Sequence, residues 1–266
     1  MRIRSKGDWG RAISLNEELM RDCQQILGPD HPRTVRIRDD LATMYEAAGQ
    51  FERAISLHAR ALWDSERILG VGHPVTLTCR NNLAYAYESA GDLDRAFSLY
   101  EQTLLDRERL LGLDHPSTLV SCNNLAGLYQ AKGEIGKAVS LYKRTLGDRE
   151  RFLGADHPDT LISLNNLAGA YRAAGNLVRA VRLYERGLDE CGRVLGKEHA
   201  TTLGVWRNLA DTYGMIGRWR EAFMTLEEAV KVSKKAYGAE HPITQGLLER
   251  RDAISRMGVF WVGGDH

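Results

Sequence analysis

Six histidines recur at one position of a repeated pattern, and histidine is the commonest side chain in metal sites and in proton transfer. Equivalent residues of stacked helical repeats lie about 10 Å apart, which is the distance between packed helices. The ligands of one zinc ion lie ~2 Å from it, so these histidines cannot share a metal. We predict a structural role in turns for all six: His31, His73, His115, His157, His199 and His241.

The rest of the chain offers few residues for catalysis. Gly133-Glu-Ile-Gly136-Lys137 is similar to a phosphate-binding loop, but it lacks the four-residue spacer, the hydroxyl residue after lysine and a preceding strand. No His-Glu-x-x-His, Gly-x-Ser-x-Gly or Cys-x-x-Cys motif is present. The sequence therefore predicts that this chain is not an enzyme and has no catalytic residue, no metal and no cofactor.

Asparagine pairs are the sharper signal, because asparagine is a mediocre helix former and has no intrinsic reason to recur in the middle of helices. Its amide carries a donor and an acceptor, so it can bind a peptide backbone of any sequence. The alternative is that these amides bond across neighbouring helices and fix their stacking. The first column is Asn81, Asn123 and Asn165, and the second is Asn82, Asn124, Asn166 and Asn208.

Charged residues on the same face of the expected helices change along the chain. The first repeat is acidic, with Asp39, Asp40 and Glu46, and the next one carries Tyr85. The later repeats are basic on this face: Arg172, Arg207, Arg250 and Arg256. Two interpretations stay open, a polar binding groove with an acidic and a basic end, or drift of surface residues.

These residues must be positioned by a repeat of 42 residues, which indicates an array of stacked units. Apolar residues at i, i+3 and i+4 spacing predict helices throughout. Prolines mark helix starts, glycines mark helix ends, and the threonine after each proline is expected to accept from free N–H groups of the first turn. We predict about twelve helices and no strand: an unpaired helix at 8–27, helix pairs at about 33–69, 75–111, 117–153, 159–195 and 201–237, a capping helix at 243–257 and a tail at 258–266.

A helical projection separates two faces of the helix predicted at 117–132. The core face holds Leu119, Cys122, Leu125, Ala126, Leu128 and Tyr129. The opposite face holds Val120, Asn123, Asn124, Gly127, Gln130 and Ala131.

This repeat resembles the tetratricopeptide repeat (TPR). The pattern Leu-Ala-x-x-Tyr-x-x-x-Gly-x-x-x-x-Ala-x-x-Leu-Tyr runs from Leu83 to Tyr100, and it recurs 42 and 84 residues later. The period of 42 and the signatures Asn-Asn-Leu-Ala and Leu-Gly-x-Asp-His-Pro resemble the kinesin-light-chain subtype. The resemblance implies an all-α, right-handed superhelical solenoid of antiparallel helix pairs, whose first helices line a concave groove. It also implies that the asparagines face that groove.

We therefore expect a non-catalytic scaffold that binds a protein or an extended peptide in the groove. The candidate binding residues are Asn81, Asn82, Asn123, Asn124, Asn165, Asn166, Asn208, Tyr85, Arg172 and Arg207. The alternative is the sensor part of a larger signalling protein, a STAND-type nucleotide hydrolase whose effector module is absent here. A small-molecule receptor is a third class, and it would need a closed pocket.

Composition and charge limit the partners and the location. The 36 basic and 35 acidic residues nearly cancel, whereas a nucleic-acid-binding surface needs a basic excess. We find neither a membrane span nor a secretory signal, so no membrane partner is expected. Four cysteines without paired spacing are expected to be free core thiols in a reducing compartment, the cytoplasm: Cys23, Cys79, Cys122 and Cys191.

The two ends of the array are expected to differ from its middle. The helix at 8–27 has no preceding partner, so an apolar strip should be bare there. After the last helix comes the apolar run Val259-Phe260-Trp261-Val262, which we expect to fold back on the last helix pair or to dock on another chain. Both features suggest self-association through the ends.

Overall fold

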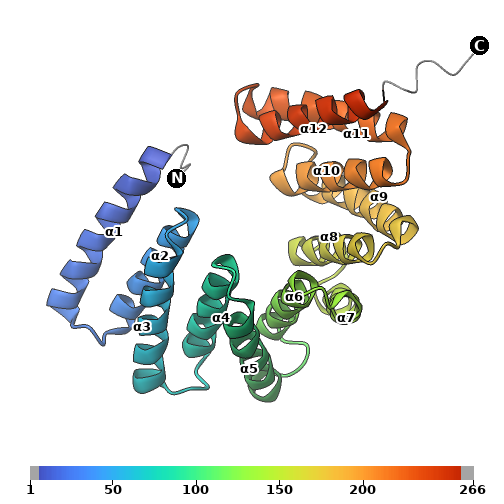
Figure 1. Cartoon of the computed structure of the whole chain (residues 1–266). Coiled ribbons are helices and arrows are strands. Elements are labelled where there is room, and N and C mark those ends of the chain that lie inside the picture. The colour runs from blue at the N-terminus through green and yellow to red at the C-terminus, as the bar shows by residue number, and fades with distance from the viewer. Residues whose placement is uncertain (1–5, 259–266) are drawn as a thin grey trace, which may run out of the picture. The chain divides into compact units, whose positions relative to one another are not determined.

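The computed structural model describes residues 6–258, with side chains from Gly10 to Met257, and this part of the chain consists of helices and turns without strands. Figure 1 shows the helices in chain order. They are α1 (Lys6–Leu27), α2 (Pro32–Ala47), α3 (Phe51–Leu69), α4 (Pro74–Ser89), α5 (Leu93–Leu111), α6 (Pro116–Ala131), α7 (Ile135–Phe152), α8 (Pro158–Ala173), α9 (Leu177–Val194), α10 (Ala200–Met215), α11 (Trp219–Tyr237) and α12 (Pro242–Gly258).

The predicted all-α class is therefore confirmed, and the observed helices follow the predicted ranges closely. The lone helix expected at 8–27 is α1, and the one expected at 243–257 is α12. Each of the five expected pairs is present, from α2 and α3 to α10 and α11.

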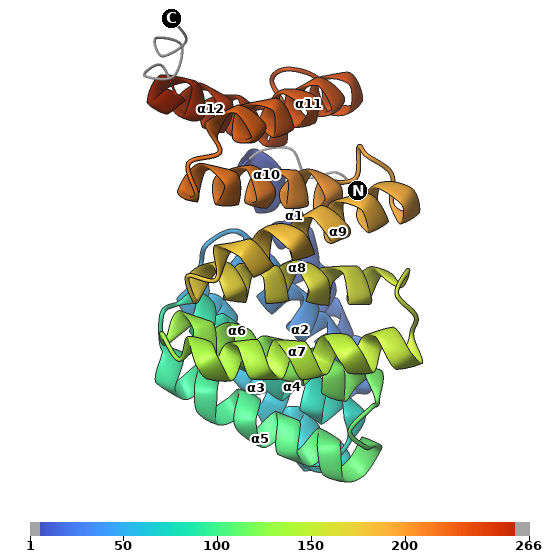
Figure 2. The ribbon, with the colours of Figure 1, turned by 90° about the vertical axis from the view of Figure 1, so that its right-hand side faces the viewer.

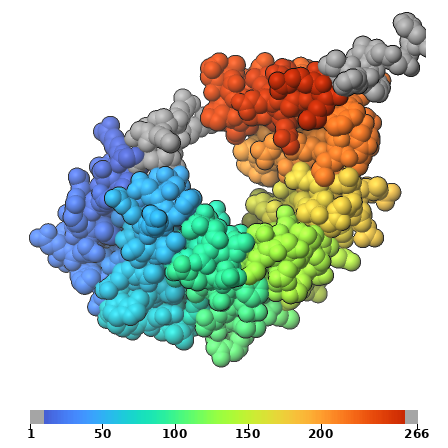
Figure 3. Space-filling view, in the orientation of Figure 1, coloured from blue at the N-terminus to red at the C-terminus, as the bar shows by residue number. Residues whose placement is uncertain are grey.

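The chain divides into two compact units, Met1–Lys132 with α1 to α6 and Gly133–His266 with α7 to α12. Within each unit every helix packs against the next one along the chain. Figure 3 shows the first unit, from blue to green, with side chains filling the space between successive helices. We call α2, α4, α6, α8, α10 and α12 the first helices and the others the second helices. First helices also contact each other directly, α2 with α4, α8 with α10, and α10 with α12.

Each joint between repeats contains one of the six histidines, and the structure shows that its role, predicted only as a structural one in the turn, is that of a helix cap. The histidine Nδ1 accepts a hydrogen bond from the backbone N–H two residues later, at 3.1–3.3 Å in all six joints. A ring nitrogen used this way satisfies one of the free N–H groups of the first helical turn. These histidines are thus structural.

In five of the six joints the threonine hydroxyl acts differently from what the sequence suggested. We expected its hydroxyl to accept from the first turn, but Thr118 Oγ1 donates to the carbonyl of Gly112, at 2.8 Å. The same bond recurs from Thr34, Thr76, Thr160 and Thr202 to the glycine six residues earlier. Because histidine already caps the helix, threonine is free to hold the end of the preceding helix. Gly112 adopts φ of +96°, a region that side chains rarely enter.

The core follows the predicted helical face. Leu119, Cys122, Leu125, Ala126 and Leu128 are all buried, while Tyr129 is half-buried and meets Phe97 edge-on with ring centroids 5.5 Å apart. Tyr100 and Tyr184, the tyrosines that end the repeat pattern, are among the largest fully buried side chains.

Buried arginines are a feature that the sequence analysis missed. Arg38 is 3% exposed and pairs with Asp64, which is 0% exposed. Arg80 pairs with Asp106 at the same two repeat positions, at 2.7 Å. In the next joints the arginine comes from the second helix instead: Arg107 donates to Ser121 Oγ at 2.8 Å, and Arg149 to Ser163 Oγ at 2.7 Å.

The bare apolar strip expected on the helix at 8–27 is present on α1. Leu15 is 54% exposed, Leu19 is 47% exposed and Ile26 is 79% exposed. At the other end, Arg251 stands where the repeats carry leucine, and it pairs with Glu227 and Asp252. The prediction for the apolar tail concerns residues 259–262, which lie outside the described part of the chain.

Candidate functional site on the first helices

The asparagines of the two columns form bonds between neighbouring first helices. Asn124 Nδ2 donates to Asn81 Oδ1 at 3.1 Å, and Asn208 Nδ2 donates to Asn165 Oδ1 at the same distance. The second column of one repeat thus meets the first column of the repeat before it, 43 residues earlier. All seven are half-buried. Each bond uses one of the two amide hydrogens, so the same side chain can stack repeats and present a second donor to a ligand.

In the first repeat an aspartate takes the place of the first-column asparagine. Asp39 accepts from Asn82 Nδ2 at 2.8 Å and lies 2.7 Å from His58 Nδ1. His58 is 0% exposed, and its Nε2 has no hydrogen-bond partner among the described residues. The asparagine ladder therefore ends on a carboxylate that is shared with a buried histidine.

Two further carboxylates lie on the same face of α2 and α4. Burial raises the pKa of Glu46, and the nearby carboxylates of Asp39 and Glu88 raise it further. Burial also raises the pKa of Glu88, whose Oε2 accepts from Tyr100 Oη at 3.0 Å. A carboxylate with a raised pKa is poorly stabilised as an anion, so it favours a cation placed beside it. Tyr85, three residues before Glu88 on α4, is 52% exposed.

In the second unit, three successive first helices line one open pocket of about 450 Å³. Arg172 comes from α8, Arg207 and Asn208 from α10, and Arg250 from α12. The structure thus brings together three of the predicted binding residues. The same pocket includes Asp211, Gly246, Glu249 and Ala253.

The arginines of this pocket are not equivalent. Asp211 Oδ1 lies 2.5 Å from Arg250 Nε, and Asp211 Oδ2 lies 4.0 Å from Arg172 Nη1. Asp211 is therefore the principal counter-ion of Arg250. Arg207 is exposed and has no carboxylate within ion-pair distance among the described side chains. Arg207 is thus the cation of this pocket that an incoming anion meets with least competition.

Glycines on this face differ in what they leave open. A Cβ on Gly204 would meet nothing within 4 Å, whereas one on Gly214 would lie 3.2 Å from the ring of Trp219. A Cβ on Gly169 would lie 3.4 Å from Tyr184 Oη. Of these three glycines, Gly204 alone borders open space. Gly214 and Gly169 instead make room for the neighbouring side chains of Trp219 and Tyr184.

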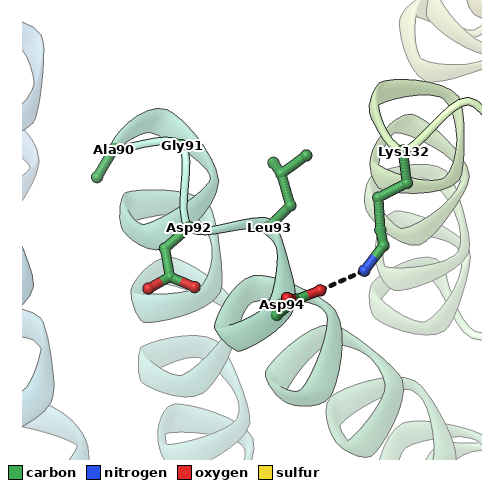
Figure 4. A pocket seen from close by; sticks show the side chains of 6 residues that line it. All are labelled: Ala90, Gly91, Asp92, Leu93, Asp94 and Lys132. Carbon is green, nitrogen blue, oxygen red and sulfur yellow. Dashed lines mark hydrogen bonds and ion pairs between the residues drawn. The ribbon is translucent and has the colours of Figure 1, made fainter.

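A second polar pocket lies at the turn between α4 and α5, and Figure 4 shows the side chains that line it. Lys132 Nζ and Asp94 Oδ1 are 2.5 Å apart across it. Asp92 caps α5 by accepting from the backbone N–H of Arg95 at 3.1 Å. The charged groups of this pocket thus bind each other or cap α5, and none of the predicted binding residues lines the pocket.

The described residues show neither a metal site nor a membrane span. No group of three or more His, Cys, Asp or Glu side chains in residues 10–257 is placed to hold a metal ion. Within the described part, none of the helices combines the length and the apolar character that crossing a bilayer requires.

Comparison with known proteins places this architecture. Two family models, both described as tetratricopeptide repeat, match residues 3–62 and 123–190 and residues 76–117 and 202–243. None of the curated proteins compared with it matches the chain. A crystallised Podosopora anserina protein, described as a kinesin light chain with nearly identical TPR-like repeats, is 32% identical, with a TM-score of 0.66. The match covers 78% of this chain and 98% of that one.

More distant structures share the fold. BtubC (BKLC) from P. vanneervenii is 21% identical, with a TM-score of 0.71, over 88% of this chain and 94% of its own. A STAND protein with a tetratricopeptide repeat sensor, PH0952 from Pyrococcus horikoshii, is 14% identical, with a TM-score of 0.69. That match covers 97% of this chain and 37% of the STAND protein. The family models, the joints that recur every 42 residues and the Podosopora anserina structure agree. The chain is a tetratricopeptide-repeat protein of the kinesin-light-chain-like subtype.

Proposed function

We propose that this protein is a non-catalytic scaffold that binds an extended segment of a partner protein along its first helices. The observation that carries the proposal is the pocket formed by α8, α10 and α12, which gathers Arg172, Arg207 and Asn208 in one place. Tetratricopeptide repeats generally serve protein binding, and a pocket with an amide and exposed guanidinium groups suits a carboxylate-bearing peptide.

The asparagines are proposed to hold the backbone of the bound segment, while the charges select its side chains. Asn81, Asn82, Asn123, Asn124, Asn165, Asn166 and Asn208 would contribute the amides, and Tyr85 would add an exposed aromatic ring. Acidic residues of the partner would bind beside Arg207, and basic residues beside Glu46 and Glu88. Because a cation lowers a raised carboxylate pKa, binding of a basic segment there should release protons.

The test starts from peptides selected by display on the full chain and measures their binding by isothermal titration. The double variant Arg172→Glu with Arg207→Glu should weaken acidic peptides about tenfold, since each exposed pair contributes about 0.2–1 kcal/mol and reversal adds repulsion. The control is Arg220→Glu with Lys231→Glu, which changes the charge by the same four units on the exposed surface of α11. Equal weakening by the control, or none by the double variant, would place the binding face elsewhere.

A second pair of variants separates the two roles of the asparagines. Asn124→Ala and Asn166→Ala should weaken every selected peptide similarly, by about 1–3 kcal/mol, because each removes a half-buried amide contact. A lower melting temperature with unchanged affinity would show instead that the asparagine ladder is purely structural.

We propose the sensor part of a larger signalling protein as a second candidate, because a STAND protein with a tetratricopeptide repeat sensor matches 97% of this chain. The two candidates differ in what precedes the repeats in the gene. A reading frame that continues upstream of the Met1 codon into a nucleotide-binding module would establish the sensor role.

The location and the assembly are proposals as well. Four free cysteines suit the reducing cytoplasm. The exposed Leu15, Leu19 and Ile26 of α1 suit self-association through the N-terminal end of the array.

A further inference from the structure

A pocket of about 420 Å³ opens between the second helices α7 and α9, away from the asparagines and from Arg207. Its floor is apolar and is formed by Leu146 of α7, Leu167 and Tyr171 of α8, and Leu183 of α9. Figure 2 shows these three helices in succession within the second unit. The pocket shares no lining residue with the pocket of α8, α10 and α12.

The pocket owes its opening to a glycine in the middle of a helix. Gly147 of α7 lies on the lining, and a Cβ added there would meet no heavy atom within 4 Å. The equivalent positions of the two preceding repeats carry Trp63 and Leu105. Glycine is among the poorest helix formers, and no close neighbour requires it here. The open space is therefore a feature of this repeat rather than of the array.

The rim of the pocket is positively charged. Lys143, Arg179 and Arg182 line it, and none of them has a carboxylate partner among residues 10–257. Arg179 lies 5.5 Å from the ring centre of Tyr171. The one acidic lining residue, Glu150, is engaged by Arg186 at 2.6 Å.

We infer that this pocket is a second protein-binding site, which takes an acidic segment of a partner with one apolar side chain inserted between α7 and α9. The apolar floor supplies the hydrophobic contact, which is worth roughly a tenfold gain in affinity or more. The cations stand on two different helices, Lys143 on α7 and the two arginines on α9. Several carboxylates along a chain satisfy that arrangement better than one carboxylate of a small molecule.

The experiment uses the full chain and fluorescein-labelled peptides of the form Gly-Ser-Glu-Asp-X-Asp-Glu-Ser-Gly, with X as Leu, Phe, Trp or Ser. Fluorescence anisotropy should show the best apolar peptide binding about tenfold more tightly than the serine peptide. Gly147→Leu should lower the affinity for the apolar peptide to that for the serine peptide. The melting temperature should stay equal or rise, because leucine favours the helix and fills open space.

Charge variants complete the test and separate this site from the groove. Arg179→Glu with Arg182→Glu should weaken the apolar acidic peptide about tenfold and flatten its salt dependence. Arg220→Glu with Lys231→Glu on α11 is the matched control, and it should leave the affinity unchanged. The inference is overturned if no peptide binds, if Gly147→Leu leaves affinity intact, or if Arg172→Glu with Arg207→Glu removes the binding instead. It is also overturned if octanoate, a small apolar carboxylate, competes as strongly as the unlabelled peptide itself.

Discussion

Replacing Asp64 by alanine should lower the free energy of unfolding of the N-terminal repeats by about 3–5 kcal/mol. Arg38 is 3% exposed and depends on the Asp64 carboxylate, which is itself 0% exposed. Without that carboxylate a guanidinium charge stays buried with no counter-ion, and few single changes cost more. Hydrogen exchange of the α2 and α3 amides should report the loss, together with the midpoint of urea unfolding.

The matched control is Asp148→Ala, at the same repeat position two repeats later. Asp148 pairs with Arg144 at 3.7 Å and Arg151 at 3.3 Å, and both arginines are well exposed. Such pairs contribute about 0–1 kcal/mol, so this control should cost little. The double change Asp64→Leu with Arg38→Met should recover most of the stability, because a buried ion pair can be replaced by apolar groups. Equal losses in both single variants would contradict the argument.

The second large effect is expected in the reactivity of the thiols. Burial raises the pKa of Cys79 to about 12 and that of Cys191 to about 11. Only the thiolate attacks a disulfide reagent, and its fraction falls tenfold for each unit that the pKa exceeds the pH. At pH 8 these two thiols should therefore react at least about 10²-fold more slowly in the folded protein than in urea, and Cys79 should be the slower of the two.

Cys23 provides the internal comparison, because it is only half-buried on α1. One fast-reacting thiol should be seen in the folded protein with a disulfide reagent, and Cys23→Ser should abolish that phase. Fast reaction of Cys79 or Cys191, identified by mass spectrometry before unfolding, would show that the core opens more readily than the packing suggests.

The same pKa shifts predict how stability depends on pH at the alkaline end. Thiols of the unfolded chain ionise near pH 8.5, whereas those of Cys79 and Cys191 stay neutral in the folded state until about pH 12 and 11. Their contribution to stability is complete below pH 8.5 and is lost as the pH rises towards those values. Thermal melts between pH 8 and 11 should show this decline, and Cys79→Ala should make it shallower.

The helix layout was predictable because its signals are local. Proline at the first turn and glycine at the last act within a few residues, so the ends of α4 or α6 follow from the sequence around them. The histidine cap has the same local character. The threonine bond was not predicted, because its acceptor belongs to the preceding helix, six residues earlier.

The buried arginines were harder to predict because their partners are distant in the chain. Arg38 lies on the core face of α2, where a later repeat has Cys122, and its partner lies 26 residues away. Nothing local in the sequence marks Asp64 as buried, since its equivalent Asp148 stands among charged residues. An arginine on a core face was nevertheless a usable signal, since a buried cation needs an acceptor.

The candidate site shows the same limit. The sequence predicted which asparagines share a face, but not that Asn124 bonds to Asn81 across two repeats. It identified the arginines on this face and left open whether they form the basic end of a groove. It did not show that Asp211 pairs with Arg250 and leaves Arg207 without a carboxylate partner among the described side chains. Pairing of this kind depends on distances between helices, which a repeat period does not supply.

The closed joints have a consequence for how such chains change in evolution. Each joint contains its own capping histidine, and in five of the six joints a threonine also bonds to the glycine six residues earlier, so these bonds join residues that are close in the chain. A gene duplication or deletion of one whole repeat therefore creates a junction that keeps these capping bonds. Unequal recombination can lengthen or shorten the array in steps of one repeat, and the number of binding positions changes with it while the folding of the neighbouring units is preserved.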